Sequence, residues 1–131
     1  MIIGIGSDLV DMRRIASSLE RFGERFTHRI YTEGERAKAA KRSDPAPTYA
    51  RRFAAKEAAA KALGVGISGL AWRDIEVAND ERGAPSLRLH GGAAGRLAAI
   101  TPEGSQPRLH LSLTDDPPYA MAFVVIEASP G

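Results

Sequence analysis

The longest helical pattern in the chain runs from residue 51 to residue 64, in the segment RRFAAKEAAAKALG. Alanine and other strong helix formers fill this segment, so it predicts a helix. Gly64 suits the left-handed position just past a helix end, and Pro45 and Pro47 mark the region where the helix begins. The flanking alanines are small and predict close packing against another element.

One face of this predicted helix combines aromatic and charged side chains. A spacing of four residues lines up Tyr49, Phe53, Glu57 and Lys61. We expect this face to be buried, and a buried charge is costly unless it is paired or bound to a metal. The alternative is an ordinary surface ion pair between Glu57 and Lys61, which stabilises a helix by about 0.2–0.5 kcal/mol.

The chain begins with apolar, mostly β-branched residues that predict a short buried strand ending near Gly6. Ser7 or Asp8 then follows as a turn or helix-capping residue, and Asp11 is a second candidate cap. A carboxylate just past a strand is also a common position for a metal ligand, so both roles stay open for Asp8. The glycines do not form a dinucleotide-binding fingerprint, because Leu9 stands where its third glycine would be.

Residues 12–26 place apolar side chains at helical spacing, which predicts an amphipathic helix. Its other face, with the residue just beyond it, carries Arg13, Arg14, Arg21, Arg25 and Arg29. This basic face predicts either a docking surface for an acidic protein or a solvated helix. Nucleic acid is the weaker candidate, because Phe22 and Phe26 fit the apolar stripe better than a stacking platform.

Residues 31–41 predict a third helix, which Thr32 opens and Glu35 completes as a capping box. Residues 43–48 then predict a turn or loop into the central helix. The glycine-rich segment GVGISGL after the central helix is a predicted loop. It is not a Walker phosphate-binding motif, because Leu70 stands where that motif requires lysine.

The second half of the chain reads mainly as strands. Residues 72–78 predict a strand, and a hairpin loop at 79–86 joins it to a returning strand that contains Leu87 and Leu89. Residues 91–100 predict a short alanine-rich helix.

Leucines then alternate with His110, Ser112 and Thr114, which predicts a strand with one apolar and one hydrogen-bonding face. His110 is either structural or part of a polar cleft. The turn DDPP leads to an apolar strand at 119–127, so the two strands should pair antiparallel, and the last residues form a frayed end.

Helices in the first half, strands in the second and one strand at the N-terminus predict an α+β fold, with helices packed on a mainly antiparallel sheet. The length of 131 residues suits a single domain spanning 1–131. The chain has no cysteine, which excludes disulfides and thiolate chemistry. The N-terminal apolar run is too short for a signal peptide or membrane span and contains Asp8, so we expect a cytoplasmic protein.

The net charge of +2 is unevenly distributed. Residues 1–60 carry 12 Lys and Arg against 8 Asp and Glu, whereas residues 61–131 carry 6 against 8. The basic excess therefore lies in the N-terminal part, where it suits an acidic partner.

Asp8 and Glu57 are candidates to share one hard cation. Mg²⁺ prefers oxygen ligands and is often held by one or two carboxylates, with phosphates and water completing its shell. Arg52, Lys56 and Lys61 supply cations near the same helix and form a candidate phosphate-binding set.

Four blocks occur in order along the chain: GIGSD near the N-terminus, RFAAKEAAAKALG in the middle, NDERGAP at 79–85 and HLSLTDD at 110–116. Over nearly the whole chain they resemble the holo-[acyl-carrier-protein] synthase family, the small trimeric 4′-phosphopantetheinyl transferases. The resemblance implies a Mg²⁺-dependent enzyme of fatty acid biosynthesis. Such an enzyme moves 4′-phosphopantetheine from coenzyme A to a serine of apo acyl carrier protein and releases adenosine 3′,5′-bisphosphate. It also implies a homotrimer with sites at subunit interfaces, and an acidic carrier protein rather than nucleic acid as the partner.

The resemblance also implies roles for individual residues. Asp8 and Glu57 match the Mg²⁺ ligands and, with Lys61 and His110, the catalytic residues. The positions similar to the coenzyme A site are Arg52, Phe53, Lys61, Gly64, Gly83, Pro85, His110 and Ser112. The positions similar to the carrier-docking helix are Arg14, Arg21 and Arg25.

Two positions depart from the family pattern. The family often has lysine where Ala84 stands and histidine where Asp115 stands, so no general-acid role carries over to Asp115. Phosphoryl transfer is catalysed mainly by positioning and charge neutralisation, and Lys61 is suited to offset charge on the leaving phosphate. For such a reaction we expect a metal-bound water, or Glu57 through that water, to accept the serine proton. His110 is a weaker candidate for orienting coenzyme A or assisting proton transfer.

Two other functions remain as alternatives. One is a non-catalytic basic module that binds an acidic protein or nucleic acid through the Arg14 helix, with salt-sensitive binding. The other is a structural subunit in which Glu57 and Lys61 form only a surface pair.

Overall fold

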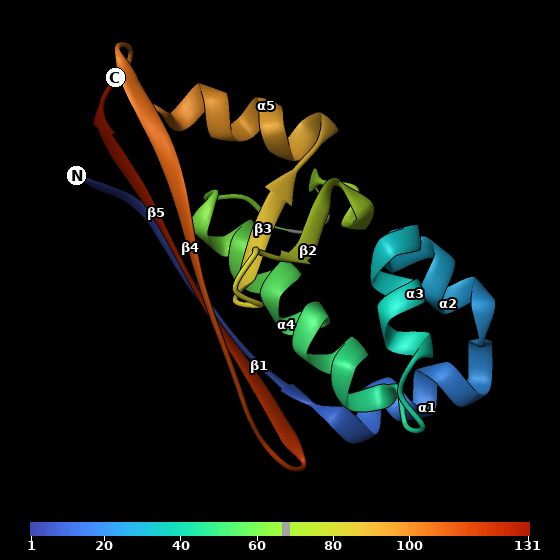
Figure 1. The fold of residues 1–131 in the computed structure, drawn as a ribbon. Coiled ribbons are helices and arrows are strands. Elements are labelled where there is room, and N and C mark those ends of the chain that lie inside the picture. The colour runs from blue at the N-terminus through green and yellow to red at the C-terminus, as the bar shows by residue number, and fades with distance from the viewer. Residues whose placement is uncertain (67–68) are drawn as a thin grey trace.

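The computed structural model describes residues 1–66 and 69–131, and it has an α+β fold in which the helices lie on one side of a long twisted sheet (Figure 1). The expected fold class is confirmed. The elements are β1 (Ile2–Asp11), α1 (Met12–Phe22), α2 (Glu24–Ile30), α3 (Glu33–Ala40), α4 (Ala46–Ala62), the 3₁₀ helix η2 (Trp72–Asp74), β2 (Ile75–Asn79), β3 (Pro85–Leu89), α5 (Gly91–Ile100), β4 (Ser105–Asp116) and β5 (Tyr119–Pro130). The predicted GVGISGL loop includes residues 67 and 68, which lie outside the described part.

The main sheet has the strand order β1-β5-β4, and both strand pairs are antiparallel. The predicted pairing of the last two strands across the DDPP turn is therefore confirmed, as is the separate β2–β3 hairpin. Along β5 every second residue is buried, and these residues are Ala120, Ala122, Val124, Ile126 and Ala128. This apolar face packs against α4, so the core lies between the sheet and the central helix.

Two glycines let α4 lie directly on β1. A Cβ atom added to Gly6 would stand 2.8 Å from the amide nitrogen of Ala62 and closer still to the carbonyl oxygen of Ala58. At Gly4 it would stand 3.1 Å from the carbonyl carbon of Ala62. Side chains larger than hydrogen therefore do not fit, and β1 carries Asp8 past α4 at backbone contact distance.

The N-terminal segment differs from the prediction in two respects. β1 continues to Asp11, so Asp8 lies within the strand and not after its end. Asp11 is the helix cap, because its side chain accepts a hydrogen bond from the backbone N–H of Arg13 at 2.9 Å. The predicted continuous helix over 12–26 is wrong, since the chain breaks at Gly23, whose φ of 54° ends α1 and redirects the chain into α2.

Three smaller boundaries also shifted. α4 begins at Ala46, inside the predicted loop. Residues 72–74 form the 3₁₀ helix η2, so the predicted strand begins only at Ile75. The expected frayed end is wrong, because β5 continues to Pro130, which pairs with Ser105 of β4.

The face of α4 expected to be buried is not the most buried one. Phe53 and Glu57 are half-buried and Lys61 is exposed. Arg52 and Lys56 are instead buried, with exposed fractions of 6% and 0%. Glu35 of α3 pairs with Lys56 there, and β2 packs on α4 as well. Within the ranges 1–66 and 69–131, no helix combines the length and apolar character needed to cross a bilayer.

Candidate active site

The first part of the candidate site lies where α4 crosses the edge strand β1. The ammonium of Lys61 donates a hydrogen bond to the carbonyl oxygen of Ser7 at 2.9 Å and lies 3.4 Å from Oδ1 of Asp8. Glu57 is one helical turn before Lys61 on the same side of α4. The structure therefore brings together three of the four predicted catalytic residues.

Burial and neighbouring charges shift the pKa values of both carboxylates. Burial raises the pKa of Asp8, and the hydrogen bond and charge of Lys61 partly oppose that effect. Burial and the negative charge of Asp8 raise the pKa of Glu57, again opposed by Lys61. Because one lysine only partly compensates two half-buried acids, the site favours an additional cation.

Asp8 and Glu57 fit Mg²⁺ by their chemistry. Both offer hard oxygen donors, and their mutual repulsion is relieved by a divalent ion. Over the part of the chain that the structure describes, no group of three or more His, Cys, Asp and Glu side chains is placed to hold a metal. The donor set is thus two carboxylates, and phosphate and water usually complete the shell of a Mg²⁺ ion held in this way.

Gly64 lies just beyond this pair and adopts the predicted left-handed conformation, with φ of 76°. Arg96 of α5 reaches the same helix end, where its Nε donates to the carbonyl oxygen of Leu63 at 2.8 Å. Arg96 could not be singled out from the sequence, because no motif connects α5 with the end of α4.

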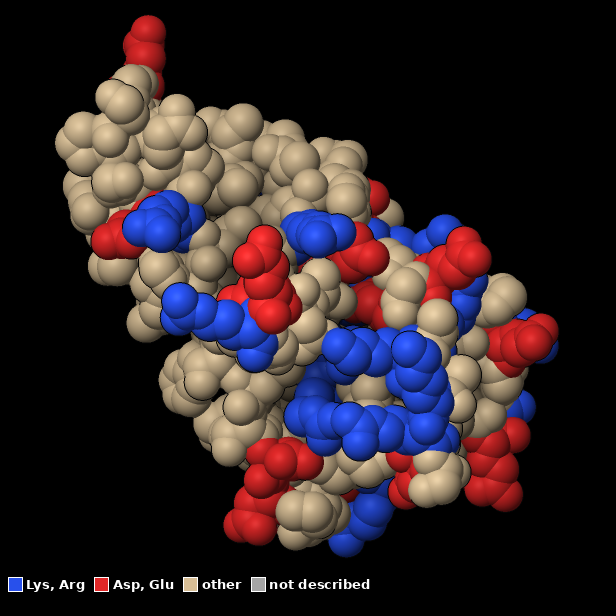
Figure 2. All heavy atoms as spheres, in the orientation of Figure 1, with Lys and Arg blue, Asp and Glu red and all other residues tan. Residues whose placement is uncertain are grey.

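The second part is a basic cavity of about 400 Å³ between α3, α4 and the β2–β3 hairpin. Its lining includes the predicted coenzyme residues Arg52, Gly83 and Pro85, together with Lys38, Arg42, Thr48, Arg51, Val77, Asn79 and Leu113. Figure 2 shows Lys and Arg side chains gathered around a hollow on the face that it draws. Lys38, Arg42 and Arg51 were missed, although the Arg51-Arg52 dipeptide was a visible signal.

Arg52 is the most constrained cation of this cavity. Its Nε is buried and has no hydrogen-bond partner among the described residues. Burial lowers the pKa of Arg52, and the charge of Glu35 partly restores it. Arg51 is held at the rim by Asp115, 3.0 Å away, so this aspartate has a structural partner.

The predicted coenzyme residues do not all meet in one place. Asp8, Glu57 and Lys61 do not line the basic cavity. Arg52 precedes Glu57 by five residues, which separates their directions around the helix by about 140°. Ser112 and His110 lie on the exposed face of β4, and His110 Nε2 is 3.1 Å from Oε1 of Glu127.

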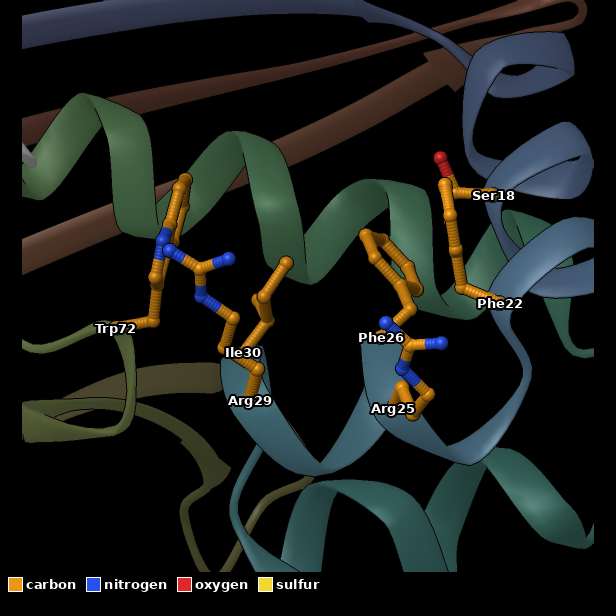
Figure 3. Close-up of a pocket in the computed structure, with 7 residues that line it drawn as sticks. All are labelled: Ser18, Phe22, Arg25, Phe26, Arg29, Ile30 and Trp72. Carbon is orange, nitrogen blue, oxygen red and sulfur yellow. The ribbon is translucent and has the colours of Figure 1, made fainter.

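Two adjacent hollows lie beside α1 and α2, the helices that carry the basic face. A groove of about 540 Å³ is lined by Ser18, Phe22, Arg25, Phe26, Arg29, Ile30 and Trp72. In Figure 3, Phe22 of α1 stands at one end, Trp72 at the other, and Arg25 and Arg29 of α2 between them. The neighbouring hollow of about 440 Å³ shares Ser18 and Phe26 and adds Val10, Arg13, Arg14, Ile15, Ser17 and Phe53.

Two of the three predicted docking arginines, Arg14 and Arg25, thus line these hollows. Arg21 stacks its guanidinium 5.4 Å from the centre of the Phe22 ring. Arg29 belongs to the basic face expected from the sequence, whereas Trp72 was not singled out there. Together these residues form a surface with apolar recesses between cations, which is complementary to an acidic partner with apolar side chains.

The chain matches the family model described as the 4′-phosphopantetheinyl transferase superfamily over residues 4–124. It is 69% identical over 129 residues to the holo-[acyl-carrier-protein] synthase of Methylobacterium sp. (strain 4-46), covering 98% of this chain and 96% of the relative. It is 60% identical over 131 residues to that of Phenylobacterium zucineum (strain HLK1), covering 99% and 95%.

Solved structures of the same kind are also similar. The holo-[acyl-carrier-protein] synthase of Neisseria meningitidis superposes with a TM-score of 0.82 at 38% identity, covering 97% of this chain and 99% of that chain. The synthase of Bacillus anthracis in complex with CoA (3′,5′-ADP) gives a TM-score of 0.78 at 37% identity, covering 98% and 99%.

Proposed function

The chain belongs to the 4′-phosphopantetheinyl transferase superfamily, and we propose that it is a holo-[acyl-carrier-protein] synthase. It transfers 4′-phosphopantetheine from coenzyme A to a serine of apo acyl carrier protein, requires Mg²⁺ and releases adenosine 3′,5′-bisphosphate. The observation that carries the proposal is the meeting of Asp8 with Glu57 and Lys61, from β1 and α4, at one partly buried site. One domain over 1–131 and a cytoplasmic location remain predictions.

In the proposed reaction the serine oxygen forms a bond to the phosphorus of the pantetheine phosphate. The bond from that phosphorus to the bridging oxygen breaks, the bisphosphate leaves with that oxygen, and the proton of the serine hydroxyl passes to water or, through water, to Glu57. Asp8 and Glu57 would hold Mg²⁺, which supplies positive charge to the diphosphate when bound. Lys61, whose exposed ammonium lies beside Asp8, offsets the charge that develops on the leaving phosphate.

Coenzyme A would use two surfaces. Its nucleotide end, which carries the 3′-phosphate, suits the basic cavity of Arg52, Gly83 and Pro85. Lys38 and Arg42 supply positive charge there, in place of the lysine that similar proteins often have where Ala84 stands. The diphosphate belongs at Lys61 and Gly64. Phe53 lies on the Glu57 side of α4, where its ring would contact the pantetheine arm.

These surfaces lie on different sides of one chain, and we propose a homotrimer in which neighbouring subunits complete each site. The outer sheet face supports this, because Ile5, Leu9 and Phe123 are 68%, 58% and 48% exposed there. His110 and Ser112 lie on the same face. A second copy that covers this face would bring His110 and Ser112 toward the Asp8–Glu57 pair of its neighbour.

Mixed oligomers test this arrangement. Glu57→Gln and His110→Ala subunits are co-expressed with different tags, and doubly tagged oligomers are isolated. If each site takes residues from two subunits, some sites in the mixture carry neither change, and transfer exceeds that of either variant alone. Equal or lower transfer contradicts shared sites, and light scattering gives the subunit number.

The acidic carrier protein would dock on Arg14, Arg21 and Arg25, which are all exposed on α1 and α2. The decisive experiment incubates the protein with coenzyme A, Mg²⁺ and apo carrier protein and weighs the carrier. We expect a mass increase equal to the phosphopantetheine group, and none with Glu57→Gln or with a chelator. An unchanged carrier mass with the unaltered protein contradicts the proposed function.

A further inference from the structure

A completely buried ion pair joins α3 to α4 next to the candidate site. Lys56, the residue before Glu57, has an exposed fraction of 0% and pairs with Glu35 at 2.8 Å. From the sequence, Lys56 is a candidate phosphate-binding cation. Its burial excludes that role, because the ammonium lies out of reach of a bound phosphate.

Every hydrogen of the Lys56 ammonium has an acceptor. It donates to Oε1 of Glu35 at 2.8 Å, to the carbonyl oxygen of Trp72 at 3.2 Å and to the carbonyl oxygen of Ile75. The carboxylate is equally well used, because its Oε1 also accepts the backbone N–H of Thr32 at 2.8 Å. Its Oε2 accepts the N–H of Val77 at 2.9 Å.

Three of the four backbone groups held by this pair, those of Trp72, Ile75 and Val77, belong to η2 and β2. These hydrogen bonds place Trp72, whose ring stacks on Phe53 of α4 with centroids 4.9 Å apart and planes at 30°. Trp72 forms one end of the groove in Figure 3, with Arg29 beside it. The hydrogen bond from Lys56 to the carbonyl oxygen of Trp72 therefore holds the backbone of a residue that lines the groove.

Stability alone does not account for such a pair. Burying two charges carries a large desolvation cost, and apolar replacements of buried ion pairs are often neutral or stabilising. What an apolar pair lacks is the ability to hold four specific backbone groups in place.

We propose that the Glu35–Lys56 pair is a positioning device that fixes Trp72 and so shapes the groove for the carrier protein. The carrier as occupant rests on the proposed function. The lining of the groove supports this occupant. Arg25 and Arg29 supply positive charge for an acidic protein, and Phe22, Phe26, Ile30 and Trp72 supply apolar surface beside that charge. The pair does not touch substrate, and it acts through the backbone of η2 and β2.

Trp72 is the single tryptophan of the chain, so its fluorescence reports its own position. The test compares the double variant Glu35→Gln/Lys56→Met with the unaltered protein, because the double variant removes both charges together and leaves neither one buried without a partner. We expect the double variant to show a red-shifted emission and stronger acrylamide quenching. We also expect its KM for the carrier to rise about fivefold to tenfold, with its KM for coenzyme A within about twofold (roughly 1–1.4 kcal/mol for the carrier).

Identical emission, quenching and carrier KM in the two proteins overturn the proposal. Should the double variant fail to fold, Trp72→Leu gives the second test. This substitution keeps the backbone network and removes the indole ring from the groove wall. It should raise the carrier KM and leave the KM for coenzyme A unchanged; an unchanged carrier KM overturns the proposal as well. If the unaltered protein transfers nothing, the proposed function fails, while the quenching comparison still tests the positioning of Trp72.

Discussion

The approach of β1 to α4 gives the sharpest prediction, the effect of Gly6→Ala. The added Cβ would lie 2.8 Å from the amide nitrogen of Ala62 and 3.0 Å from the carbonyl carbon of Ala58. Non-bonded heavy atoms settle about 3.5–4.0 Å apart, so relief requires α4 to move away from β1 by on the order of 1 Å. Both obstructing groups are backbone atoms inside a helix, and no side-chain rotation relieves the contact.

This displacement is large for a metal site. Mg²⁺–oxygen bonds are about 2.0–2.1 Å long and tolerate little change, so Asp8 and Glu57 should no longer bind one ion well. A misplacement of about 1 Å costs on the order of 10²-fold in turnover. Overpacking costs about 1–3 kcal/mol of unfolding free energy. At roughly 4 °C per kcal/mol, the melting temperature should fall by about 4–12 °C.

The assay measures carrier mass gain per unit time, and Mn²⁺ binding by paramagnetic resonance gives a readout that does not depend on turnover. Gly95→Ala is the matched control, because a Cβ at Gly95 in α5 meets nothing within 4 Å. It should keep full turnover and gain up to about 1 kcal/mol of stability, since alanine is the better helix former. A Gly6→Ala protein with unaltered turnover and metal affinity would falsify the geometric argument.

Three further predictions follow from the site. Burial raises the pKa values of Asp8 and Glu57, so the native state binds more protons than the unfolded state and the metal-free protein loses stability as pH rises through these values. Stabilisation by Mg²⁺ should grow over the same pH range, so melting temperatures with and without the ion should move apart as pH rises. If the ion binds elsewhere, the difference between the two melting temperatures should not depend on pH in this way. Arg25→Glu should raise the KM for the carrier at least tenfold without changing turnover at saturation. Arg88→Glu makes the same charge change outside the groove and should leave both quantities unchanged. Equal effects of the two substitutions would show that the carrier does not dock on the groove. Arg52→Met should weaken coenzyme A binding by about 10–100-fold, as expected for a lost charge-assisted hydrogen bond, and leave dephospho-coenzyme A unaffected; calorimetry with both compounds decides.

Local structure was predictable because its causes lie within a few residues. Thr32 and Glu35 form the expected capping box, since both partners sit in one helical turn. The antiparallel pairs follow from alternating side chains that flank short turns. The helix over 12–26 shows the limit of this reasoning, because its apolar spacing continues across Gly23 while the backbone does not.

Burial on α4 was not predictable in the same way. Alanines occupy most sides of the helix, so the sequence pattern does not mark one side as the core. Arg52 and Lys56 are buried because α3 and β2 cover that side and bring Glu35 and backbone carbonyls to meet the charge. Those partners lie far along the chain, and no local spacing points to them.

The sequence by itself determined which segments become helices and strands and which side chains carry the oxygen ligands and the cations. Local propensity and side-chain chemistry act over a few residues, and they leave the distance between elements open. Tertiary packing decided that distance: two glycines admit α4 to the surface of β1, and Lys61 reaches Asp8 across the contact. It also decided that Arg52 and His110 face other surfaces of the same chain, because the direction of a side chain depends on what packs beside its element.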